Sequence, residues 1–77
     1  MNSSMYMNIL ISKLEMLRDN LNNSITEIDN VSNKLNNALS INGNAVISRD
    51  LSSIKRDLIS KRDFLNNYVI PEARNNR

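Results

Sequence analysis

Residues 7–38 read MNILISKLEMLRDNLNNSITEIDNVSNKLNNA, and apolar side chains recur in this stretch every seven positions. A first row is spaced seven apart, and a second row follows three positions after it: Met7, Leu14, Leu21, Ile28 and Leu35, then Leu10, Leu17, Ser24, Val31 and Ala38. Such a heptad pattern is typical of a helix that packs along its length against another helix. The sequence therefore predicts a long amphipathic helix over about residues 4–40.

The only glycine of the chain follows this segment, in the stretch Ile41-Asn42-Gly43-Asn44. Glycine adopts the left-handed backbone conformation found in many turns without steric cost, and asparagine tolerates it. We therefore predict a turn at residues 41–44, with Ile41 and Gly43 as its turn residues.

A second heptad pattern predicts a helix over about residues 45–70. Its inward rows contain Ile47, Leu51, Ile54, Leu58, Lys61, Leu65 and Tyr68. Pro71 lacks a backbone donor and disfavours helical geometry before it, so residues 71–77 are expected to form a frayed or loosely helical tail. The predicted fold is all-α: residues 1–77 form one antiparallel, coiled-coil-like hairpin of two helices, which a partner completes to a bundle.

Folding the two helices back about the turn pairs residues whose numbers total about 85, so Leu21 lies near Leu65. The polar residue that interrupts the first helix, Ser24, then falls opposite the polar residue that interrupts the second, Lys61. Two interpretations remain open. Ser24 leaves room for the aliphatic stem of Lys61 within the interface, or Lys61 lies at the edge of the interface.

Several further apolar residues gather toward the end of the hairpin that is remote from the turn. A lone hairpin cannot bury them, and an exposed apolar cluster marks an association site, although single exposed apolar residues are ordinary. The expected partner is another helical protein or a second copy of this chain. The candidate partner-binding residues are Met5, Tyr6, Ile9, Ile11, Met16, Phe64, Val69 and Ile70.

The composition argues against catalysis. The chain has no cysteine and no histidine, which removes disulfides, thiolate nucleophiles, the commonest metal ligand and the commonest general base. A single glycine cannot build a glycine-rich phosphate loop. We expect no enzymatic activity, no catalytic residue, no cofactor and no metal site.

The charge pattern argues against a nucleic-acid partner. The net charge is only +2, and basic residues alternate with acidic ones, as in Lys55-Arg56-Asp57 and Lys61-Arg62-Asp63. No stretch approaches the length of a membrane span, and the first residues lack the features of a Sec signal peptide. We expect a protein that is cytoplasmic, or secreted without a Sec signal peptide.

Two local features resemble the WXG-type, ESX-like proteins of type VII secretion, which are small helical hairpins that pair with a helical partner. Where that family has Trp-x-Gly at the turn, this chain has Ile41-Asn42-Gly43, so the glycine is present and the tryptophan is replaced. Where the family has the export tail Tyr-x-x-x-Asp/Glu, this chain has Tyr68 followed by Glu72. The resemblance spans nearly the whole chain. It implies a secretion substrate or an accessory subunit, with Tyr68 and Glu72 in the export tail.

Two other functions fit the same pattern. One is an intracellular, chaperone-like hairpin of the type III secretion co-chaperone class, and the other is a structural subunit of a coiled-coil assembly. All three functions have a common basis, which is a non-enzymatic amphipathic hairpin that a partner completes.

Overall fold

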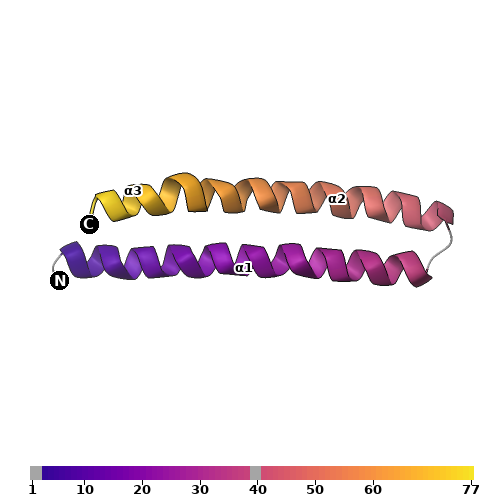
Figure 1. Ribbon diagram of the computed structural model, residues 1–77, viewed down its shortest axis with the longest axis horizontal. Coiled ribbons are helices and arrows are strands. Elements are labelled where there is room, and N and C mark those ends of the chain that lie inside the picture. The colour runs from indigo at the N-terminus through magenta and orange to yellow at the C-terminus, as the bar shows by residue number, and fades with distance from the viewer. Residues whose placement is uncertain (1–2, 39–40) are drawn as a thin grey trace.

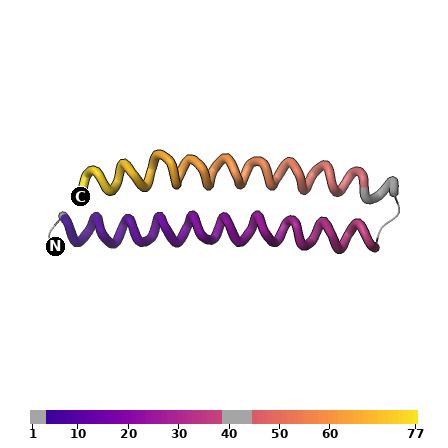
Figure 2. Tube along the Cα trace, in the orientation of Figure 1, coloured from indigo at the N-terminus to yellow at the C-terminus, as the bar shows by residue number. Residues whose placement is uncertain are grey.

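The computed structural model describes residues 3–38 and 41–77, which form two long helical runs packed side by side in opposite directions (Figure 1). Helix α1 spans Ser3–Ala38, and the returning run consists of α2 (Ile41–Phe64), the π-helical segment η1 (Leu65–Val69) and α3 (Ile70–Asn75). The start of α1 and the end of α3 lie at the same end of a molecule 58 Å long (Figure 2). The predicted all-α antiparallel hairpin is confirmed.

The position of the turn differs from the prediction. Helix α2 begins at Ile41, so residues 41–44 form its first turn, and the connection from α1 falls at residues 39–40, outside the described residues. The first N–H groups of any helix have no partner within the helix, and glycine and asparagine are common at helix starts. Gly43 and its two asparagines therefore fit the start of a helix as well as they fit a turn.

The first row of each predicted interface lies between the helices. Met7, Leu14, Leu21, Ile28 and Leu35 of α1 are half-buried, as are Leu51, Leu58 and Leu65 of the returning run. Half-burial is what two helices achieve without a third element, because each helix covers only one side of the other.

The second row lies one residue further along each helix than predicted. In α1, Ile11 and Ile25 are buried, whereas Leu17 and Val31 are exposed. In the returning run the inward positions belong to Ser48, Lys55, Arg62 and Val69, and the predicted residues Ile47, Ile54, Lys61 and Tyr68 are exposed.

This difference follows from helix geometry. Positions three and four residues after a first-row residue lie on either side of it, so each gives a heptad interface of the same width. The positions four residues after the first row include Ile11 and Ile25. They also include the polar side chains that reach the opposite helix. Apolar content alone favours the positions three residues after the first row, such as Leu17 and Val31. This is why the prediction of the second row was wrong.

Pro71 does not end the helix. Its ring would clash with the carbonyl four residues earlier in a regular α-helix, and it cannot donate a hydrogen bond. The chain widens into η1 before the proline, and the N–H of Ile70 donates to the carbonyl of Leu65, five residues back. Helix α3 then continues to Asn75, and the Asn76 side chain donates to the carbonyl of Glu72 (2.8 Å). The tail is therefore helical to Asn75 rather than frayed from Pro71 onward.

The extra residue in η1 changes which side chains face α1. A continuous α-helix would turn Glu72 inward at the end of the hairpin, whereas the structure places Ile70 and Ala73 there. Ile70 is 1% exposed and is the most completely buried large side chain among the described residues. The predicted partner-binding residues Ile11 and Ile70 are instead part of the core of the hairpin, so this part of the prediction was wrong.

Truncating Ile70 tests this core. We expect Ile70→Ala to lower the free energy of unfolding by about 2–4 kcal/mol, because it leaves a cavity and removes buried methyl groups. The matched change Ile9→Ala, at a side chain that is 47% exposed, should cost less than about 1 kcal/mol. Urea unfolding followed by circular dichroism measures both, and equal losses would contradict the assigned core.

Candidate partner-binding face

One broad face of the hairpin carries a reciprocal set of polar contacts, which we call the polar face. Arg18 donates from Nη1 to Oδ1 of Asn66 (3.1 Å), and Arg62 donates from Nη1 to Oδ1 of Asn22 (2.9 Å). Each arginine also binds the aspartate that follows it, Asp19 or Asp63. These six residues line one shallow hollow between the helices.

The polar face comes from a short internal repeat. The pattern Arg-Asp-x-Leu-Asn occurs at residues 18–22 and again at residues 62–66. In each copy the arginine reaches the asparagine of the other copy, so the two helices are related at this point by a near two-fold axis perpendicular to the hairpin. The sequence analysis missed this repeat, although it is visible in the sequence and indicates how the helices align.

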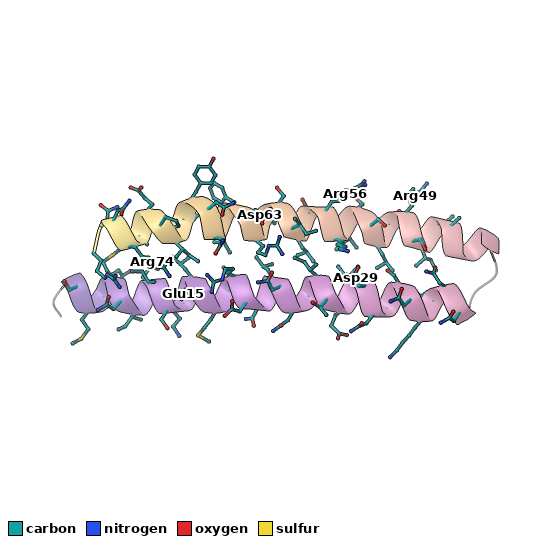
Figure 3. The ribbon with its side chains drawn as sticks, viewed as in Figure 1. Glu15, Asp29, Arg49, Arg56, Asp63 and Arg74 are labelled. Carbon is teal, nitrogen blue, oxygen red and sulfur yellow. The ribbon has the colours of Figure 1, made fainter. Side chains whose placement is uncertain are left out.

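Further polar contacts join the two helical runs. Lys55 binds Asp29 (2.7 Å), and Arg74 lies 3.7 Å from Glu15 at the other end of the hairpin (Figure 3). The numbers of Lys55 and Asp29 total 84, as do those of each arginine and asparagine pair on the polar face. The predicted alignment, with totals of about 85, is therefore correct to within one residue.

Lys61 does not lie within the interface. Its side chain is exposed, and its Nζ binds Asp57 one helical turn earlier (2.8 Å). Ser24 is exposed as well. Of the two interpretations, the structure supports Lys61 at the edge.

The opposite broad face is apolar, because both helices turn their displaced second rows toward it. We call it the apolar face and define it by Leu10, Leu17, Val31, Ile47, Ile54, Phe64 and Tyr68. Leu17 is 48% exposed, Phe64 60% and Tyr68 69%. The rings of Phe64 and Tyr68 contact each other with centroids 5.8 Å apart.

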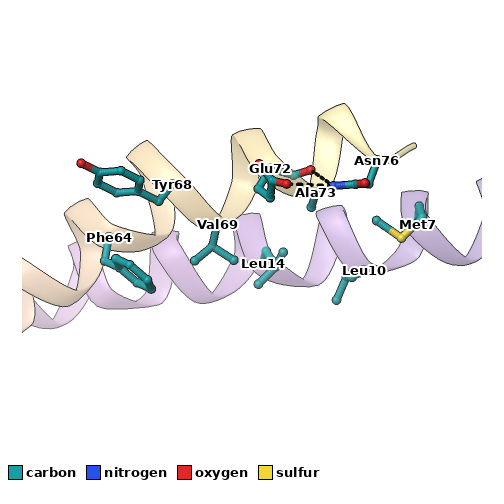
Figure 4. A pocket seen from close by; sticks show the side chains of 9 residues that line it. All are labelled: Met7, Leu10, Leu14, Phe64, Tyr68, Val69, Glu72, Ala73 and Asn76. Atoms are coloured by element: carbon teal, nitrogen blue, oxygen red, sulfur yellow. Dashed lines mark hydrogen bonds between the residues drawn. The ribbon is translucent and has the colours of Figure 1, made fainter.

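Two hollows follow the groove between the helices on the apolar face. The hollow nearer the chain ends has a volume of about 620 Å³ and is lined by Met7, Leu10, Leu14, Phe64, Tyr68, Val69, Glu72, Ala73 and Asn76 (Figure 4). The next has a volume of about 560 Å³ and is lined by Leu17, Leu21, Ser60, Lys61, Phe64 and Leu65. Phe64 lines both hollows, which together extend along α1 from Met7 to Leu21. At about 1.5 Å per residue, this stretch of α1 is about 21 Å long.

The predicted partner-binding residues are distributed over more than one surface. Phe64 belongs to the apolar face, and Val69 is half-buried in the floor of its groove. Met5, Tyr6, Ile9 and Met16 are exposed, as expected for a binding surface. Met5, Ile9 and Met16 lie about half a turn from the first row of α1, which places them on the outer side of that helix.

The two residues that resemble an export tail are both accessible. Tyr68 and Glu72 are exposed and line the same hollow (Figure 4). Tyr68 was predicted to pack in the interface near Leu17, but it is exposed like the earlier residues of its row, and its ring contacts Phe64.

No group of three acidic side chains within residues 3–38 and 41–77 is close enough to hold a metal ion. The described helices also include none with the length and apolar character that crossing a membrane requires.

Comparison with known proteins finds no matching family model, no matching curated protein and no matching solved structure.

The repeat on the polar face allows a matched test. Arg62→Met keeps the aliphatic stem but removes the guanidinium that binds Asn22, and we expect a loss of about 1 kcal/mol in unfolding free energy. Arg49→Met removes a similar pair with the following aspartate, Asp50, but Arg49 projects away from α1 (Figure 3), so its loss should be near zero. Urea unfolding measures both, and equal effects would show that the contact with Asn22 contributes nothing.

Proposed function

We propose that this chain is a non-enzymatic protein–protein interaction module whose apolar face docks against helices of a partner. The observation that carries the proposal is the separation of the two broad faces. Polar side chains that bind one another occupy one face, and large apolar side chains that remain exposed occupy most of the other.

The accessible surface of the chain supports a docking role. The hairpin exposes 5679 Å² to solvent at a mass of 8.8 kDa. A compact monomer of this mass exposes about 4,800 Å², so the hairpin exposes about 900 Å² more than it would in a compact fold. The exposed residues include large apolar side chains such as Leu17, Phe64 and Tyr68, and apolar patches larger than a few hundred Å² mark interaction sites in soluble proteins.

The residues of the apolar face are suited to binding. Aromatic side chains are enriched where interfaces gain most of their binding energy, and Phe64 and Tyr68 stand together beside the groove. The groove that they flank is lined mainly by apolar side chains, which is the surface that an amphipathic helix fills.

Site-specific photo-cross-linking in cells that contain the protein tests this proposal. A photoreactive residue at position 17, on the apolar face, should give a discrete protein adduct, because a docked partner covers Leu17. The same residue at position 23 is the control. Asn23 is exposed and lies two positions from Leu21, so it points away from the groove. Adducts of equal yield from both positions, or none from position 17, would contradict the proposed docking face.

A type VII secretion substrate or accessory subunit is a second candidate. It is supported by one observation, which is that Tyr68 and Glu72 are exposed on the same side of the last helical segments. A recognition tail has to be accessible in the folded hairpin, and neither side chain belongs to the buried core.

The second candidate predicts a separation of export from folding. Tyr68→Ala or Glu72→Ala should reduce export by at least about tenfold in a type VII host, while the unfolding free energy changes by less than about 1 kcal/mol. The matched control Asn67→Ala alters an exposed neighbour of Tyr68 and should export normally. Unchanged export of both variants would remove this candidate. Secreted and cellular fractions, together with urea unfolding, give the readout.

A further inference from the structure

We infer that the occupant of the apolar face is a second copy of this chain, placed so that α1 of each copy covers α2 of the other. The inference rests on the proposed docking function and names its partner. The product is an antiparallel four-helix bundle in which the two polar faces point outward into water.

The area of the broad face matches the area that a stable dimer buries. The hairpin measures 58 by 16 Å across its broad face, which corresponds to about 900 Å², and stable interfaces bury about 800 Å² on each partner. The same figure of about 900 Å² is the excess of exposed surface over a compact monomer. A partner of the same length and width covers this face completely, whereas a single helix covers only the groove.

The apolar residues of α1 and those of α2 lie at the same levels along the apolar face. Val31 on α1 lies at the level of Ile54 on α2, and Leu17 lies at the level of Tyr68, as the alignment of the helices requires. When α1 of a second copy covers α2, each of these apolar residues meets its apolar counterpart. The near two-fold axis of the hairpin thus makes the face complementary to itself.

The position of Lys61 selects the orientation of the second copy. Lys61 is the charged residue on the line of Ile54 and Tyr68, and it lies near the middle of the hairpin at the level of Ser24. If α1 covers α2, Lys61 meets Ser24 of the second copy, and its amine remains at the edge with Asp57. If α2 covers α2, the two Lys61 side chains approach each other near the centre of an apolar interface, where like charges are costly.

Single cysteines test both the occupant and its orientation, because the chain contains no cysteine of its own. Val31→Cys and Ile54→Cys chains are prepared separately, mixed in urea, refolded together and oxidised. We expect the mixed disulfide to exceed each homodisulfide by at least about fivefold, since a disulfide forms only where the Cα atoms come within about 7 Å. Light scattering of the unmodified chain should give twice the monomer mass.

Each other outcome overturns the inference. A dimer that gives mainly homodisulfides has the opposite orientation. A helical monomer at about 100 μM, or a chain without helical structure at that concentration, excludes a self-sufficient pair. Mixed and homodisulfides in statistical proportion show random collision rather than docking.

Two variants separate contact from misfolding. Phe64→Asp should weaken the dimer by at least about a hundredfold, because it places a charge in the centre of the apolar face. Asn23→Asp adds the same carboxylate on the outer side of α1 and should leave the dimer unchanged. Equal effects of the two variants would contradict the assigned face.

The cross-linking experiment distinguishes this inference from the proposed function. An adduct at position 17 with twice the chain mass supports both. An adduct of another mass keeps the docking function and excludes a second copy as the occupant.

Discussion

The rest of the structure depends on the packing of one leucine row of each helix against the other, because two helices alone have only one interface. Leu21 and Leu65 stand in the middle of it, and even these side chains remain half-buried. Within residues 4–38 and 45–77, the buried side chains are Ile11, Ile25, Ile70 and Ala73, and of these Ile70 is the most completely buried. Since hydrophobic burial is the main favourable term in folding, such a thin core leaves little stability to spare and much apolar surface in water.

One rotation of the helices produces both broad faces. Turning the row with Ile11 and Ile25 inward also brings the stems of Arg18 and Arg62 over the interface, and their guanidinium groups reach the polar face. The same rotation moves Leu17 and its counterparts outward. The hydrogen bonds that fix the alignment and the exposed apolar face are therefore two results of a single helix orientation.

The heptad rows predicted the helices, the hairpin and its alignment to within one residue, because period and length are properties of the sequence alone. They did not predict the second row, since positions three and four residues on are geometrically equivalent and only contacts between helices decide between them. Pro71 was interpreted as the end of a helix, although a widened turn accommodates it. The burial of Ile70 follows from that turn, and the exposure of Tyr68 follows from the displaced second row, so both were wrong in the prediction. The repeated Arg-Asp-x-Leu-Asn pattern contained the missing information about orientation.

The π-helical segment connects the core with the apolar face. By adding one residue before Pro71, η1 brings Ile70 inward, and its own residue Tyr68 faces outward against Phe64. The most buried large side chain therefore depends on these five residues, and one ring of the apolar face lies among them. A partner that covers Phe64 and Tyr68 binds only the folded hairpin, so docking adds its free energy to that of folding. In the proposed complex, stability and association are therefore coupled, and the concentration of the partner raises the population of the folded hairpin.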